Sequence, residues 1–157
     1  MTPIETDVTV LWQVTRPPSI DDASVQALVS HILAEERATG RWNVAVVLST
    51  NHHIQALHRD FMGLDSPTDI MTFAYEPDTV PVADDDHAMA QGGDIVISVE
   101  QAAVNAEEEG WETADEILFL ICHGVLHLIG WDDGAPGQRD AMLNRQREIL
   151  GSFRQFG

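Results

Sequence analysis

The chain has 157 residues, 44% hydrophobic and 22% charged, which is the composition of one globular domain, 1–157, with a sizeable core. No apolar run approaches the roughly 18 residues of a membrane span, and the N-terminus lacks the basic and apolar stretches of a signal peptide. A single cysteine cannot form an internal disulfide, so we expect a reducing, cytoplasmic location and no membrane partner.

The charge balance constrains the partners. The 26 acidic residues outnumber the 8 basic ones, all of them arginine, and the formal net charge is −18. Phosphate contacts normally come from Lys and Arg, so strong nonspecific binding to nucleic acid is not expected. Such a chain would meet RNA through a local arginine patch with a metal ion, or through a protein partner that holds the RNA. Solubility or a saline cytosol would also explain the acidity.

Hydrophobic periodicity predicts four strands and five helices in the order β-α-β-α-β-β-α-α-α. The strands are expected at 7–14, 42–48, 70–75 and 95–99. The helices are expected at 21–39, 51–61, 99–110, 113–129 and 136–150. The fold class that follows is α+β, with a small mixed four-stranded sheet packed with about five helices. The last two strands should be antiparallel, because their connection is long enough for a hairpin.

Some details of these elements can be checked against the structure. Thr113 is expected to cap the fourth helix, and Phe61 is expected to point into the core from the second. Residues 76–91 contain several carboxylates and two prolines, which predicts an exposed, mobile acidic loop whose carboxylates are solvated rather than bound to a hard cation. Three histidines of the second helix do not converge on one face and are interpreted as surface residues: His52, His53 and His58.

The stretch from His123 to Asp133 carries the most chemistry. It follows the apolar run 117–122, and a helix that is apolar on nearly every side should lie in the core. On that helix His123 and His127 share one face, one turn apart. A glycine then ends the helix, and the next turn can bring Asp132 or Asp133 back toward the histidines. Two nitrogens and one oxygen would form a metal site with an open fourth position, as in catalytic zinc sites.

Two alternatives remain open at this point. The spacing of the histidines can arise by chance in a chain with seven of them, and each could then be an ordinary hydrogen-bonded core residue. Cys122 could be a small packed thiol or a further ligand, although its side chain points about 100° away from that of His123 on a helix.

The stretch resembles the signature of the YbeY family of bacterial rRNA-processing metalloproteins, H-G-x-L-H-L-x-G-Y-D-H. Trp131 stands in place of the tyrosine, and Asp133 stands in place of the third metal-binding histidine. The positions that match are His123, Gly124, Leu126, His127, Leu128, Gly130 and Asp132.

Further segments are similar to the same family in the same order. Residues 57–73 match most of L-N-x-x-[FY]-R-x-x-D-x-P-T-D-V-L-S-F, but Met62 replaces the arginine thought to face the RNA. Residues 93–98 match G-D-I-x-I-S. The similarity covers most of the chain.

The resemblance implies a single YbeY-like metalloprotein domain with a zincin-like buried metal-site helix. It also implies a metal-dependent, single-strand-specific endoribonuclease, a hydrolase of phosphodiester bonds, in late 16S rRNA maturation and ribosome quality control. The implied ligands are His123, His127 and Asp133 on one divalent ion, zinc first, with manganese or nickel as alternatives. The implied partners are rRNA in the small ribosomal subunit, one of its proteins and an Era-type GTPase.

The two departures from the family pattern leave the activity open. Met62 and Asp133 favour the alternative of a ribosome-assembly factor that binds without efficient cleavage, and Asp133 could also be an exposed turn residue. Arg59, one turn earlier than Met62, is expected to take over the substrate-facing role. Position 124 is Gly, so the helix lacks the glutamate of H-E-x-x-H, which counts against a peptidase. The base would then be a metal-bound water or an acidic residue from another segment, and no catalytic side chain is assigned.

Overall fold

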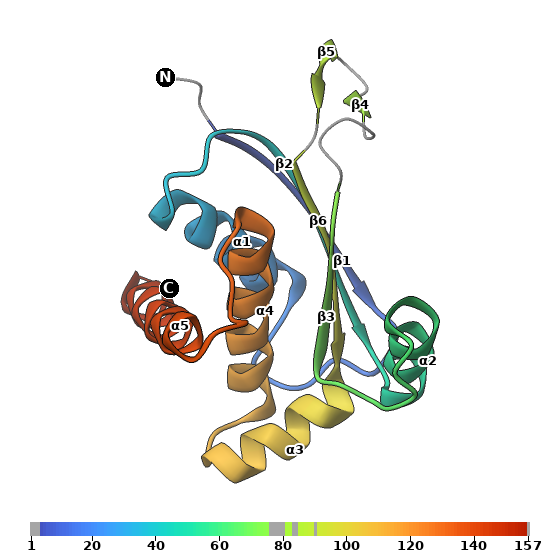
Figure 1. Cartoon of the computed structure of the whole chain (residues 1–157). Coiled ribbons are helices and arrows are strands. Elements are labelled where there is room, and N and C mark those ends of the chain that lie inside the picture. The colour runs from blue at the N-terminus through green and yellow to red at the C-terminus, as the bar shows by residue number, and fades with distance from the viewer. Residues whose placement is uncertain (1–3, 76–80, 83–84, 90, 157) are drawn as a thin grey trace.

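The structure is a computed structural model that describes residues 4–75, 81–82, 85–89 and 91–156 (Figure 1). Its elements are β1 Ile4–Trp12, α1 Asp22–Glu35, β2 Gly40–Ser49, α2 Asn51–Met62, β3 Ile70–Ala74, β4 Pro81–Val82, β5 Asp85–Met89, β6 Gln91–Ser98, α3 Val99–Glu109, α4 Thr113–Ile129 and α5 Pro136–Phe156. None of the helices in these ranges is long and apolar enough to cross a membrane.

Four strands form one mixed sheet in the order β1-β2-β6-β3. Strands β1, β2 and β6 are parallel, and β3 is antiparallel to β6, as the length of the connection predicted. The predicted α+β class with a four-stranded sheet and five helices is confirmed. The two short strands β4 and β5 pair separately as a hairpin that was not predicted. The expected acidic loop at 76–91 thus contains β4, β5 and the first residue of β6, and its remaining residues, 76–80, 83–84 and 90, lie outside the described part of the chain.

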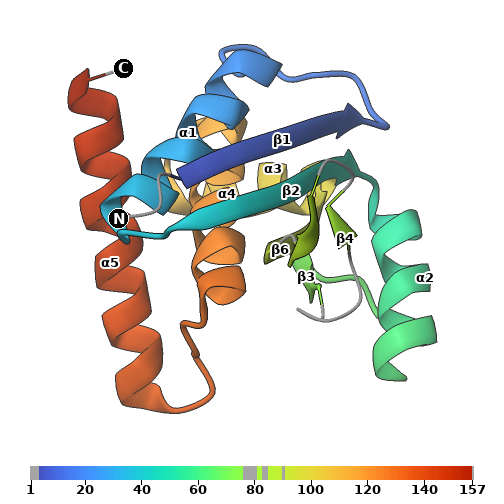
Figure 2. The same cartoon turned by 90° about the horizontal axis from the view of Figure 1, so that it is seen from above.

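The sheet has a main core on one face and a smaller one on the other. Helices α1, α4 and α5 lie on one side of the sheet and α2 on the other, and α4 runs between the sheet and α5 (Figures 1 and 2). Alternation along β6 explains the division, because Ile95 and Ile97 belong to the main core while Val96 packs with Ile54 of α2 and Met71 of β3. The metal-site helix predicted from the sequence is therefore the central helix of the main core.

Most helix boundaries agree with the prediction, and the exceptions have local causes. Helix α1 ends at Glu35, before the predicted 39, because Arg37 turns the chain with φ 55°. Helix α5 continues to Phe156 instead of 150. Thr113 is the first helical residue of α4 and not its cap; the cap position is Glu112, whose N–H donates to Asp115 Oδ2.

The expectation that Phe61 points into the core is wrong. Its side chain is 66% exposed and meets Phe73 of β3 edge-on, with ring centroids 5.4 Å apart. Strand β3 is the last strand of the sheet on that side, so the final turn of α2 lies over an edge that no further strand of the sheet covers. Of α2, only Ile54 near its start is fully buried.

Helix α4 approaches the sheet closely at Gly124. A Cβ atom at this position would lie 3.0 Å from two carbons of Ile95 and 3.2 Å from Cδ1 of Ile70. These distances are shorter than ordinary carbon–carbon contacts, so a hydrogen side chain is what lets the helix reach β6 and β3. The glycine next to His123 therefore sets the height of the metal-site helix above the sheet.

This packing predicts opposite outcomes for two Gly→Ala substitutions. Gly151 in α5 has no atoms near its projected Cβ, so Gly151→Ala should raise the free energy of unfolding by about 1 kcal/mol through helix propensity. Gly124→Ala should lower it, because overpacking costs about 1–3 kcal/mol. Urea unfolding of both variants measures the difference, and equal stabilisation would contradict the tight contact.

Helix α4 also buries a carboxyl group, Glu116, which is 5% exposed. Burial raises its pKa above 4.5, nearby Asp69 and Glu109 raise it further, and a hydrogen bond from Asn105 Nδ2 at 3.2 Å opposes them. The folded protein therefore holds this proton more tightly than the unfolded chain does.

The raised pKa of Glu116 makes stability fall as pH rises from about 4.5 through the pKa of the folded state, because only the folded chain keeps the proton in that window. Glu116→Gln should remove this loss, so its melting temperature should exceed that of the wild type at pH 7 and approach it near pH 4. Glu108→Gln, an exposed change of equal charge, serves as control. A Glu116→Gln gain that does not depend on pH would refute the assignment.

Candidate metal centre

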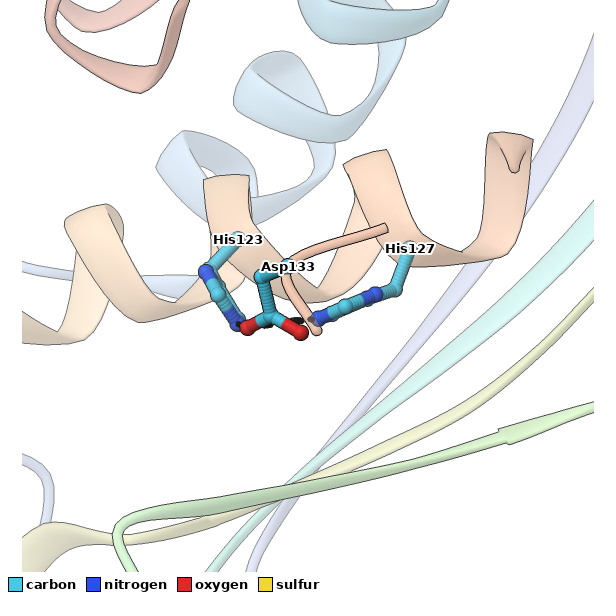
Figure 3. Close-up of side chains that lie close together, drawn as sticks. All are labelled: His123, His127 and Asp133. Atoms are coloured by element: carbon cyan, nitrogen blue, oxygen red, sulfur yellow. Dashed lines mark hydrogen bonds and ion pairs between the residues drawn. The ribbon is translucent and has the colours of Figure 1, made fainter. Parts of the chain in front are cut away.

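Three side chains converge at the end of α4 (Figure 3). His123 and His127 project from the same side of the helix, and their Nε2 atoms are 3.0 Å apart. Asp133, in the turn after α4, places Oδ2 3.4 Å from each of these nitrogens. The side chains are 21%, 24% and 35% exposed, so one side of the group is open to solvent. The structure thus brings together the three residues that the sequence singled out as ligands.

The outer nitrogen of each imidazole is already engaged. His127 Nδ1 lies 3.0 Å from the carbonyl oxygen of Trp131, which can only accept a hydrogen bond, so Nδ1 carries the hydrogen. His123 Nδ1 lies 3.0 Å from Gln146 Oε1 and donates to it. In the neutral imidazoles both Nε2 atoms therefore turn lone pairs toward Asp133.

This set of donor atoms fits a divalent ion. Two nitrogen lone pairs and a carboxylate oxygen repel one another at 3.0–3.4 Å unless a positive charge lies among them. Ligand atoms about 2.0–2.2 Å from a tetrahedral zinc ion are themselves about 3.3–3.6 Å apart. The separations in the group are close to that range, and two imidazoles with a carboxylate are a common ligand set of hydrolytic zinc sites.

The turn after α4 determines which of the two aspartates, Asp132 or Asp133, faces the histidines. Gly130 ends the helix with φ 122°, a conformation that favours glycine. Asp132 is exposed, and its Oδ1 accepts a hydrogen bond from the N–H of Gly134 at 3.1 Å. Asp132 therefore shapes the turn, while Asp133 faces the histidines.

Trp131 is anchored to two other helices. Its indole N–H hydrogen-bonds Glu36, just beyond the end of α1, and the same carboxylate accepts from Arg145 Nε of α5 at 2.7 Å. Because the carbonyl of Trp131 holds His127, this network fixes the orientation of one ligand. The sequence did not point to these residues or to Gln146, because Glu36, Arg145 and Gln146 lie far from the motif along the chain.

Cys122 is a packed thiol and not part of the group. It is fully buried, and its Sγ lies 3.9 Å from the carbonyl oxygen of Gln146. Burial raises the pKa of the thiol to about 12, so it stays protonated near neutral pH and unsuited to bind metal as a thiolate.

The residues singled out on α2 lie apart from the trio of His123, His127 and Asp133. Of the three histidines interpreted as surface residues, His52 is exposed, whereas His53 and His58 are half-buried. His58 Nδ1 lies 2.9 Å from the carbonyl oxygen of Ser66. Arg59 is exposed, pairs with the adjacent Asp60 at 3.3 Å, and belongs to a helix on the other side of the sheet from α4 (Figure 1). Its substrate-facing role stays a prediction.

Comparison with known proteins shows the family of this chain. Residues 13–154 match a family model described as Endoribonuclease YbeY. This chain belongs to the YbeY family. Proteins named endoribonuclease YbeY include one from Bacillus licheniformis, 35% identical over 141 residues, or 88% of this chain and 89% of that protein. Another, from Enterococcus faecalis, is 32% identical over 154 residues, or 94% and 97%. The family predicted from the sequence motifs is confirmed.

A solved structure has a similar fold. The solution structure of a Thermotoga maritima protein superposes with a TM-score of 0.56 at 22% identity, covering 95% of this chain and 93% of that protein. At this identity the likeness concerns the fold alone. It agrees with the mixed sheet and the packed helices that place the two histidines of α4.

The site geometry predicts that metal affinity depends on Asp133 and not on Asp132. Asp133→Asn and Asp132→Asn remove the same charge from adjacent residues. The first should weaken zinc binding by about tenfold or more, because an amide oxygen is a poorer ligand than a carboxylate. The second keeps an oxygen that can accept from Gly134 and should leave affinity nearly unchanged. Competition against a chromophoric chelator measures both, and equal loss in the two variants would show that only the net charge matters.

Proposed function

We propose that this YbeY-family chain is a metal-dependent, single-strand-specific endoribonuclease that acts in late 16S rRNA maturation and ribosome quality control, within a single domain, 1–157. The observation that carries the proposal is the convergence of His123 Nε2, His127 Nε2 and Asp133 Oδ2 on one partly exposed point. The relatives named endoribonuclease supply the class of reaction.

Each residue of the trio has a separate role in this proposal. His123 and His127 would hold the ion through their inner nitrogens, and Asp133 would complete the set with an oxygen. When bound, the ion supplies a Lewis acid for a phosphate oxygen and an activated water. The exposed side of the group admits the phosphodiester. Zinc is the first candidate, and the carboxylate shifts the preference toward harder ions such as manganese, with nickel also possible.

We further propose that the chain works in the cytoplasm with rRNA of the small subunit, one of the small-subunit proteins and an Era-type GTPase. With a net charge of −18 the protein attracts basic proteins more readily than bare RNA. A basic ribosomal protein would then hold the enzyme near its substrate, and Arg59 would contribute a local phosphate contact.

A second candidate function has one specific observation in its favour. Met62, at the position of the family's arginine, is 62% exposed beside the exposed Phe61, so this surface is apolar where the family pattern has a positive charge. Loss of one group that stabilises transition-state charge costs on the order of 10²–10³ in rate in other enzymes. An assembly factor that binds rRNA or protein partners without efficient cleavage would have such a surface.

A cleavage assay separates the two functions. The purified protein should cut a labelled single-stranded RNA in the presence of Zn²⁺ or Mn²⁺, a chelator should abolish cleavage, and His123→Ala should reduce the rate at least 10²-fold, since it removes one of three ligands. A duplex of the same sequence should resist cleavage. An intact single strand with zinc, manganese and nickel alike would favour the assembly factor.

A further inference from the structure

We propose that Gln146 of α5 is a positioning residue for His123: its side-chain oxygen holds the imidazole as the Nδ1–H tautomer and so keeps Nε2 free for metal. The inference rests on the proposed metal site. It makes metal loading depend on a helix that contributes no ligand of its own.

Gln146 is the buried polar residue that links α5 to the metal-site helix. It is 1% exposed, and its side chain bridges two residues of α4, with Oε1 3.0 Å from His123 Nδ1 and Nε2 3.4 Å from the carbonyl oxygen of Phe119. A buried amide is stable only when both of its ends are paired. Gln146 meets this condition, because its amide oxygen contacts His123 and its amide NH₂ contacts the backbone carbonyl of Phe119.

The backbone contact fixes the direction of the amide. The Phe119 carbonyl can only accept, so the amide NH₂ must face it and the amide oxygen must face His123. A reversed amide would place its oxygen against the carbonyl oxygen of Phe119 and its NH₂ against Nδ1 of His123. Since the amide oxygen can only accept, His123 Nδ1 must donate, which leaves the lone pair on Nε2.

The other tautomer would be unable to bind metal at this point. It would put a hydrogen on His123 Nε2, aimed at His127 Nε2, 3.0 Å away, and near Asp133 Oδ2, 3.4 Å away. That hydrogen would form a bond inside the trio in place of the ion. Gln146 therefore selects the state of the imidazole in which the ligand set is complete.

The two histidines differ in how they are held, which makes the proposal testable. The acceptor for His127 is the backbone carbonyl of Trp131, which no side-chain substitution removes. The acceptor for His123 is the side chain of Gln146, whose NH₂ donates to the carbonyl of Phe119, and the backbone carbonyl of Gln146 lies 3.9 Å from the thiol of Cys122. Substitution of Gln146 should thus affect His123 and leave His127 as an internal control.

Three variants of α5 test the role of Gln146. Gln146→Met nearly keeps the volume but removes the acceptor, Gln146→Glu keeps an acceptor and adds charge, and Asn144→Met places the same new side chain on the exposed side of the helix. Zinc affinity by chelator competition should fall about 10–100-fold for Gln146→Met, while Gln146→Glu should bind as tightly as the wild type or more tightly. Asn144→Met should stay within about twofold of the wild type, because nothing near the trio has changed.

The second readout needs neither metal nor activity. In metal-free wild type, ¹⁵N NMR of the imidazoles should show the Nδ1–H tautomer for both histidines of the trio. In Gln146→Met the His123 signals should become a mixture of tautomers while those of His127 stay unchanged. If Gln146→Met does not fold, Gln146→Asn, whose acceptor is one methylene shorter, should give the same shift.

The outcomes separate this inference from the proposed function. Unchanged zinc affinity in a folded Gln146→Met, or an unchanged His123 tautomer, would overturn the positioning role while leaving the metal site intact. A wild type that binds no divalent ion would overturn the proposed function, and the tautomers of the metal-free protein would still decide whether Gln146 sets the state of His123.

Discussion

The central constraint in this molecule is that three electron-rich atoms are held together by elements that cannot easily separate. The histidine nitrogens and the Asp133 oxygen lie 3.0–3.4 Å apart, a distance at which they repel without a shared positive charge. Packing of α4 against the sheet at Gly124 and the glycine-dependent turn after the helix keep them there. Local arrangements that are unfavourable by themselves are typical of functional sites, where the surrounding fold maintains them.

The predictability of the site depends on how far its members lie apart in the chain. His123 and His127 could be found from helical spacing alone, because both belong to one apolar helix. The choice between Asp132 and Asp133 required the turn geometry, in which one carboxylate caps the backbone and the other turns inward. Gln146 could not be found, since its contact with His123 spans 23 residues and arises only when α5 packs on α4.

The errors in the predicted fold have a similar origin. The four strands of the sheet and the five helices followed from periodicity, but the exposure of Phe61 depends on where β3 ends the sheet, which no local pattern contains. The predicted cap of α4 is one residue too late, because the backbone N–H of Glu112 donates to the carboxylate of Asp115 at the helix start, although a threonine is a good cap by propensity. In each case a contact formed by the fold overrides the local preference.

The positions of Arg59 and the trio bear on single-strand specificity. Arg59 lies on α2, and the two histidines of the trio lie on α4, on the opposite side of the sheet, with β3 as the edge between these helices (Figure 1). Successive residues of β3 show the division, since Ile70 packs toward Gly124 of α4 and Met71 toward Ile54 of α2. A substrate that reaches both Arg59 and the trio has to bend around this edge. A single strand can bend over such a short distance, whereas a duplex with a persistence length of about 150 base pairs resists it. Where one substrate contacts both Arg59 and the trio, the proposed preference for single strands would follow from the thickness of one sheet, without any contact that reads the bases.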